Sequence, residues 1–194
     1  MNHDRYDDTY IRGILNTVKT IAMVGISPKE NRPSYFAFKY LLERGYRMFP
    51  INPGQAGHEI LGQKVYAKLA DVPEPIDMVD IFRGSQYAMG IVQEALALKP
   101  PPQAIWMQLT VRDDAAAKLA EDAGLKVVMN RCPKIEYGRL SSEIGWIGVN
   151  SRILSSKRAK ILGKGVQRMS LNRPSVQGAP ERTIKQEENT DQSD

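Results

Sequence analysis

Five short apolar runs, spread over the first two thirds of the chain, constrain its fold more than any other feature. Each run is apolar almost throughout and does not alternate with polar residues, which is typical of strands buried on both faces of a parallel sheet. The segments between the runs leave room for the crossover connections that parallel strands need. The runs are TIAMVG (20–25), YRMFPIN (46–52), IDMVDIF (76–82), AIWMQL (104–109) and LKVVMN (125–130).

Helix signals flank these runs. Ile11 and Ile14 recur at helical spacing behind Asp7, which is suited to cap a first turn. Pro33 suits the first turn of a second helix, and Gly45 suits its end. Helices are expected over residues 7–19, 33–45, 85–98 and 112–123.

The alternation of strands and helices predicts a Rossmann-like α/β sandwich of three layers. Its sheet is expected to be mainly parallel, with five strands in the order 3-2-1-4-5 and helices on both faces. The chain then reverses direction at the first strand. Ligands of such sheets bind in the crevice that this reversal opens at the carboxyl ends of the strands.

The alternation of strands and helices ends after the fifth run, so we divide the chain into a domain, an extension and a tail. We expect a Rossmann-like domain over residues 1–140 and an extension over 141–163 that packs on it, with Trp146 among its apolar residues. Residues 164–194 are polar and basic, with scattered Pro, Gly, Gln and Glu, and are expected to be a disordered tail.

Charge and composition narrow the class of protein. The formal net charge is +5, but much of the excess lies after Asn150, so nucleic-acid binding through the tail is the less favoured interpretation. The N-terminus is polar, and no apolar run reaches the length of about 18 residues that a membrane span needs. We therefore expect a cytoplasmic protein without membrane contact. The single cysteine, Cys132, excludes an internal disulfide framework.

The turn after the first strand carries the strongest signal for a ligand. Gly25 closes the strand and a helix begins near Ser34, so that free N–H groups and the helix dipole attract phosphate there. Ser27 adds a hydroxyl group, and Lys29 and Arg32 add positive charge. A glycine at this place also serves the tight turn that any such fold needs.

The same turn does not fit the NAD-binding fingerprint. In G-x-G-x-x-G, Ser27 and Glu30 would occupy the second and third glycine positions. The second strand ends in FPINP, without the acidic residue that holds the ribose of NAD. Both differences count against NAD as the ligand.

Several segments, taken in their order along the chain, resemble the bacterial coenzyme A-binding protein family. They are VGISPKENRPSY, GYRMFPINP, EILGQKVY, DMVDIFR, AIWMQL and VVMNRCPKIEY. The fold of that family is similar to the CoA-binding domain of the succinyl-CoA synthetase α subunit. The resemblance implies a domain that holds coenzyme A, or an acyl-CoA, across the carboxyl ends of its strands. It implies a ligand and no reaction.

The resemblance also implies binding positions at the strand ends. Together with Arg32 from the turn, the expected cofactor-binding residues are Gly25, Ile26, Ser27, Arg32, Ser34, Tyr35, Asn52, Pro53, Phe82, Arg83 and Gln108. Trp106 and Met107 also match the family, but Trp106 lies in a buried run and is expected in the core. Thr110 stands where the family usually has glycine, which places the contacts at the fourth strand in doubt.

No catalytic set is apparent, and a binding module is favoured over an enzyme. His3 and His58 are interpreted as ordinary surface histidines, and Cys132 as a small residue at the end of a strand, although basic neighbours leave a reactive thiol open. The alternative is an NAD(P)- or acyl-CoA-dependent enzyme that uses the same crevice. A protein partner is left open.

Overall fold

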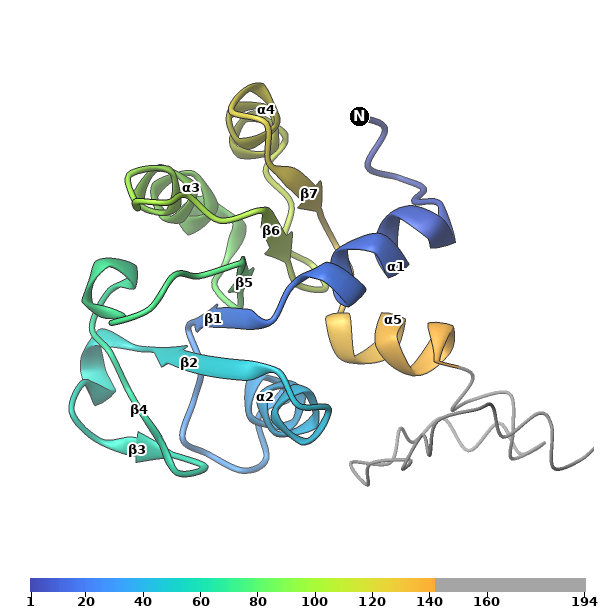
Figure 1. Cartoon of the computed structure of the whole chain (residues 1–194). Coiled ribbons are helices and arrows are strands. Elements are labelled where there is room, and N and C mark those ends of the chain that lie inside the picture. Colours follow the sequence, from blue (N-terminus) through green and yellow to red (C-terminus); the bar gives the residue numbers. More distant parts are fainter. Residues whose placement is uncertain (142–194) are drawn as a thin grey trace, which may run out of the picture. The chain divides into compact units, whose positions relative to one another are not determined.

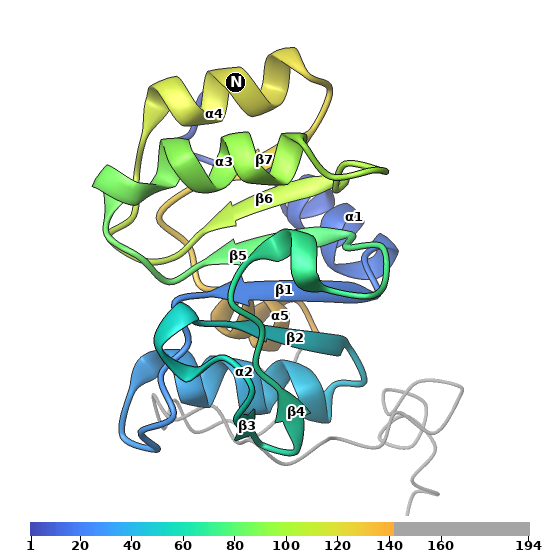
Figure 2. The same cartoon turned by 90° about the vertical axis from the view of Figure 1, so that its left-hand side faces the viewer.

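The sheet of this protein is parallel throughout. In the computed structural model, which describes residues 1–141, each strand runs parallel to its neighbours, in the order β2-β1-β5-β6-β7 (Figures 1 and 2). The five strands coincide with the five apolar runs and confirm the predicted Rossmann-like class. They are β1 (Thr20–Val24), β2 (Arg47–Ile51), β5 (Met78–Ile81), β6 (Ala104–Met107) and β7 (Lys126–Val128).

Helices cover both faces of the sheet, as predicted. One face carries α1, α2 and α5 and the other carries α3 and α4 (Figure 1), and an apolar cluster of buried residues fills each interface. Asp7 and Asp113 cap α1 and α4 by accepting hydrogen bonds from the N–H groups of Thr9 and Ala116. The helices are α1 (Asp8–Thr17), α2 (Pro33–Glu43), α3 (Ala88–Leu96), α4 (Asp114–Asp122) and α5 (Pro133–Leu140).

Further features of the chain lie outside the main sheet and the helices that cover it. The segment after β2 contains a hairpin of β3 (Glu59–Ile60) and β4 (Gln63–Lys64). The extension and the tail expected beyond residue 141 lie outside the described residues. Within residues 1–141, no helix combines the length and the apolar character of a membrane span.

The predicted strand order is wrong for the third strand. Instead of lying outside β2, β5 pairs with the opposite edge of β1. The outer edge of β2 is already occupied, because the Tyr66 N–H donates to the Pro50 carbonyl at 2.9 Å and the Tyr66 carbonyl accepts from Asn52 N–H at 2.9 Å. In addition, the Asp77 carboxylate accepts from the N–H groups of Lys19 and Thr20, which fixes the start of β5 beside β1.

This order moves the point at which the chain reverses direction. From β1 the chain passes through α2 to β2 on one side, whereas β5, β6 and β7 follow one another on the other side through α3 and α4. The reversal therefore lies between the neighbouring strands β1 and β5. The carboxyl ends of these two strands border the crevice in which ligands of such sheets bind.

Two tyrosines satisfy the open edge of the sheet at β7. The Tyr10 hydroxyl accepts from the Val127 N–H at 3.0 Å and donates to the Val127 carbonyl at 3.2 Å, and the Tyr6 hydroxyl accepts from the Met129 N–H at 2.7 Å. Burial raises the pKa of Tyr6 to about 12, so this phenol stays neutral. Because an unpaired strand edge is a template for association, these side chains protect β7.

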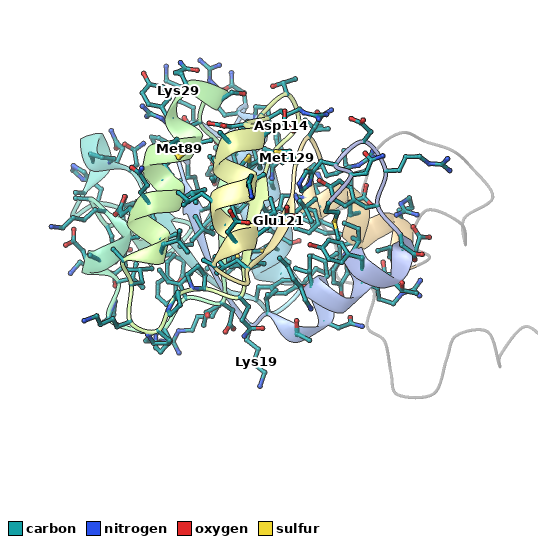
Figure 3. The ribbon with its side chains drawn as sticks, turned by 90° about the horizontal axis from the view of Figure 1, so that it is seen from above. Lys19, Lys29, Met89, Asp114, Glu121 and Met129 are labelled. Carbon is teal, nitrogen blue, oxygen red and sulfur yellow. The ribbon has the colours of Figure 1, made fainter. Side chains whose placement is uncertain are left out.

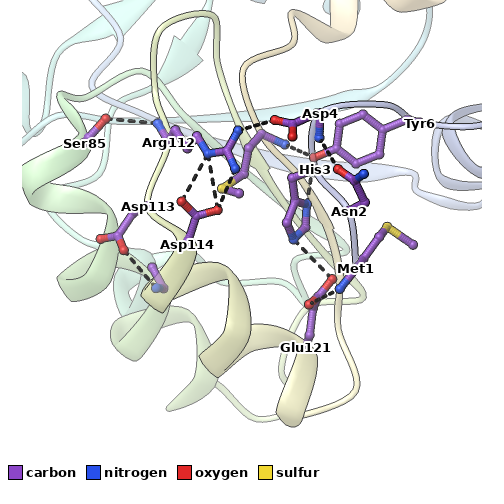
Figure 4. Close-up of polar contacts among 12 residues, drawn as sticks. Met1, Asn2, His3, Asp4, Tyr6, Ser85, Arg112, Asp113, Asp114 and Glu121 are labelled. Carbon is purple, nitrogen blue, oxygen red and sulfur yellow. Dashed lines mark hydrogen bonds and ion pairs between the residues drawn. The ribbon is translucent and has the colours of Figure 1, made fainter.

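Ion pairs fasten the segment before α1 to the same side of the domain (Figure 4). Arg112 lies between two carboxylates, 2.6 Å from Asp4 and 3.0 Å from Asp114. The His3 ring, predicted to be an ordinary surface residue, is almost fully buried, with Nδ1 2.8 Å from the Tyr6 hydroxyl and Nε2 3.4 Å from Glu121. The segment is therefore part of the folded domain.

Replacing Tyr10 by phenylalanine should lower the free energy of unfolding by about 1–2 kcal/mol, because the Val127 N–H then lacks its partner at the sheet edge. Urea denaturation measures the change. Tyr87→Phe is the matched control, since the Tyr87 ring is 48% exposed, and its effect should stay within about 0.5 kcal/mol. Equal effects of the two variants would contradict the role given to Tyr10.

Candidate functional site

The carboxyl ends of β1 and β5 meet at Gly25. This residue has φ +91°, and a Cβ atom placed on it would lie 2.6 Å from the Phe82 carbonyl oxygen and 2.7 Å from Cδ of Arg83. Such a distance leaves no room for a side chain, so glycine is required here for both conformation and space. The predicted residues Gly25, Phe82 and Arg83 are thus brought together at the reversal point of the sheet.

Asn52 joins the end of β2 to the same turn. Its side-chain amide donates to the Ile26 carbonyl at 2.7 Å, and its side-chain oxygen accepts from the Gly54 N–H at 3.0 Å. The Ile26 side chain itself is fully buried in the core, so only its backbone takes part in the turn. Pro53 is exposed and begins a short 3₁₀ turn, Pro53–Gln55.

The loop between β1 and α2 is closed by a serine pair. The Ser27 N–H donates to the Ser34 hydroxyl at 3.1 Å, and the Ser27 hydroxyl accepts from the Lys29 N–H at 3.2 Å. Ser34 is only 6% exposed, so its hydroxyl holds the loop against the first turn of α2. The sequence correctly placed these residues at the turn, but it did not show that they bond to each other.

Positive charge borders this turn from two elements. Lys29 and Arg32 are exposed on the loop before α2, and Arg32 occupies the N-cap position without a side-chain cap of its own. Arg83 follows β5, lies against Gly25, and places its guanidinium carbon 4.5 Å from the centroid of the Tyr87 ring. Three cations beside a helix N-terminus make this the end of the sheet that favours an anion.

Tyr35 lies at the rim of the turn and is tied to the loop rather than to another strand. Its hydroxyl donates to the Glu30 carboxylate at 3.3 Å. Partial desolvation and the neighbouring Glu30 charge raise the pKa of Tyr35, so the phenol stays protonated and keeps its bond to Glu30.

Gln108 and Asp80 form a buried pair beneath the strand ends. The Gln108 side-chain N–H group donates to both carboxyl oxygens of Asp80, at 3.0 and 3.2 Å, and the two residues are 3% and 0% exposed. Burial raises the pKa of Asp80 to about 8, and the bond from Gln108 opposes this only in part. Sequence reasoning missed Asp80, although an aspartate inside the apolar run IDMVDIF was the signal available.

Three further residues that the sequence analysis discussed, Trp106, Cys132 and Thr110, have roles in the packing or the backbone of the domain. Trp106 is fully buried, as expected, and its ring N–H donates to the Arg131 carbonyl at 2.8 Å. Burial raises the pKa of the Cys132 thiol and nearby Asp80 adds to the effect, so a reactive thiolate is disfavoured. Thr110 has φ +68°, the left-handed conformation that suits the glycine usual at this place, and its N–H donates to the Asn130 side chain at 2.8 Å.

Comparisons with known proteins find a family, relatives and solved structures that are similar to this chain. The model of a family described as a CoA-binding domain matches residues 19–138. The uncharacterized protein YneT of Bacillus subtilis is 32% identical over 127 residues, which are 66% of this chain and 91% of YneT. A hypothetical protein from Pyrococcus horikoshii superimposes with a TM-score of 0.66 at 40% identity, over 71% of this chain and 94% of that protein.

A longer protein is similar to part of this chain. The α subunit of an ADP-forming acetate–CoA ligase from Pyrococcus furiosus is 30% identical over 80 residues. These residues are 39% of this chain but only 17% of the ligase subunit. The similarity therefore concerns one part of that subunit.

Gly25→Ala should lower the free energy of unfolding by about 3 kcal/mol, because a Cβ atom meets the Phe82 carbonyl and the backbone is left-handed. Gly57→Ala is the matched control, since Gly57 has φ +85° but no atom within 4 Å of its added Cβ, and should cost about 1 kcal/mol. Denaturant unfolding of both variants isolates the cost of the close approach. Equal costs would contradict it.

Asp80→Asn should remove a pH dependence of stability. The folded protein keeps a proton on Asp80 up to about pH 8, whereas the unfolded chain releases it near the ordinary value of 3.8. Native stability should therefore fall by about 2–4 kcal/mol as the pH rises from 5 to 8.5. The variant should show a flatter profile in thermal or urea unfolding, while Asp122→Asn, at an exposed helix pair, should keep the native slope.

Proposed function

The chain belongs to the CoA-binding domain family, and from this membership we propose that it binds coenzyme A, or an acyl-CoA, at the turn between β1 and α2. The observation that carries the proposal is the contact of Gly25 with the Phe82 carbonyl and Arg83. Because residue 25 has no side chain, the Phe82 carbonyl and the Arg83 side chain lie directly against the turn at the reversal point. The same contact places the Arg83 cation beside the loop that carries Lys29 and Arg32.

The chemistry of this rim suits the anionic part of coenzyme A. A pyrophosphate and a 3′-phosphate need several donors and cations, and the rim offers the start of α2 together with Lys29, Arg32 and Arg83. Arg83 and the exposed Tyr87 ring offer a stacked pair on which an adenine can lie. The ADP-forming acetate–CoA ligase subunit, which is similar to part of this chain, is named for an activity that uses CoA, and this supports the same ligand class.

We favour a binding protein over an enzyme. The Cys132 thiol has a raised pKa, and the His3 ring is almost fully buried and held by Tyr6 and Glu121. Asp80 is fully buried, so it does not contact the bulk of a ligand. The role of the protein would then be to hold CoA or acyl-CoA, with any chemistry supplied by a partner.

Removing two rim cations should weaken CoA binding. Lys29→Ala combined with Arg32→Ala should raise the Kd for CoA by about tenfold or more, because both charges face the proposed phosphate position. Lys19→Ala is the matched control, since Figure 3 shows Lys19 and Lys29 at opposite ends of the described domain, and it should leave the Kd unchanged. Titration calorimetry with CoA, acetyl-CoA and NAD measures these values.

Each outcome of this titration decides between functions. Binding of CoA or acetyl-CoA that weakens in the rim variant and in added salt supports the proposal. Binding of NAD in preference to CoA would favour the dinucleotide-dependent enzyme. No binding of any of the three at millimolar concentration would overturn the proposal.

A further inference from the structure

Asp80 lies on β5, next to β1, one residue before the end of the strand that borders the proposed binding turn. In the sheet, Asp80 is in register with Met23 of β1 and with Trp106 of β6. Asp80 comes two residues before Phe82, and its partner Met23 comes two residues before Gly25. With about 3.3 Å per residue along a strand and about 4.8 Å between strands, its backbone is roughly 8 Å from the Gly25 turn. A charge on Asp80 would therefore be close to a ligand phosphate at that turn.

The surroundings of Asp80 do not compensate a negative charge. Buried Met23 and Trp106 flank it in the sheet, and Gln108 gives it one neutral amide donor. At the N-cap of α5, the Cys132 thiol is a titratable group that interacts with Asp80, and the Lys134 ammonium acts in turn on this thiol. Among the described residues, the groups that shift the pKa of Asp80 include no cation.

A buried carboxyl of this kind lowers the stability of the protein near neutral pH. A side chain of similar shape without the acid, such as asparagine, would keep the bond to Gln108 and avoid this cost. Groups that weaken a fold without an evident gain in packing are concentrated at functional sites. Because Asp80 lies close to the proposed binding turn, its charge is expected to affect the ligand.

We propose that Asp80 is a protonation switch for the ligand site: its neutral form permits tight binding of the CoA phosphates above it, and its ionisation weakens that binding. The inference rests on the proposed function. Ionisation releases the Asp80 proton to solvent and leaves a carboxylate in an apolar layer, where it repels the ligand phosphates with little screening. By linkage, the bound phosphates favour the neutral carboxyl, so Asp80 takes up a proton from solvent when the ligand binds at alkaline pH.

The test uses acetyl-CoA, because its blocked thiol does not titrate in the range that is examined. The Kd of the native protein should rise about fivefold between pH 7 and pH 9, as expected for a coupling of about one pKa unit. Calorimetry at pH 8.5 in buffers of different ionisation enthalpy should show an uptake of about half a proton per ligand. Asp80→Asn should abolish both effects and bind acetyl-CoA at pH 9 as tightly as the native protein does at pH 7.

Control variants separate Asp80 from its neighbours. Cys132→Ser removes the thiol that lies near Asp80 and should keep the native pH profile. Lys29→Ala should weaken binding equally at both pH values. If the asparagine variant does not fold, the proton uptake of the native protein still decides the matter, because a merely structural Asp80 would give none.

Failure of this inference can be distinguished from failure of the proposed function. If acetyl-CoA and CoA do not bind at any pH, the proposed function is overturned, and the switch with it. If acetyl-CoA binds with a Kd and a proton uptake that do not depend on Asp80 between pH 7 and pH 9, only the switch is overturned.

Discussion

The close contact between Gly25 and the Phe82 carbonyl is the constraint on which the candidate site depends. It can form only because β1 and β5 are neighbours in the sheet, and only because residue 25 has no side chain. The contact sets the path of the loop toward α2, which the bond from Ser27 to Ser34 and the bond from Asn52 to Ile26 then hold. The ends of three strands are thereby fixed to one another before any ligand arrives.

Electrostatics, and not close packing, distinguishes the part of the core around Asp80. Around Asp80 the core is apolar, and a carboxyl is retained there with a single neutral partner, Gln108. Burial shifts its pKa to about 8, close to the pH at which proteins function, so a small change in its surroundings is sufficient to change its charge. In the proposed site, the turn is specified by shape and the buried carboxyl by electrostatics.

The far edge of the sheet is closed by side chains and not by another strand. Tyr6 and Tyr10 bond to the backbone of Met129 and Val127, and the Arg112 ion pairs hold the segment that carries Tyr6. Arg112 also donates its backbone N–H to the Ser85 hydroxyl, just after Arg83, so the same residue connects this edge with the border of the site. The segment before α1 thus stabilises the domain at both places.

The sequence by itself determined the elements of this fold, because their signals are local. Continuous apolar runs specify buried parallel strands, and Asp7, Pro33 and Asp113 specify where helices begin. The turn at the end of β1 was found for the same reason, because Gly25 directly follows an apolar run in the sequence. These features depend on neighbours in the chain.

Only the tertiary structure decided the strand order and the inner half of the site. Tyr66, from a segment without a strong strand pattern, occupies the outer edge of β2, and β5 consequently pairs with β1. Gln108 was expected to face a ligand but instead donates to Asp80, a contact between residues 28 positions apart. Which edge is free, and whether an acid is solvated or buried, depends on groups that are distant in the chain, and no local pattern encodes this.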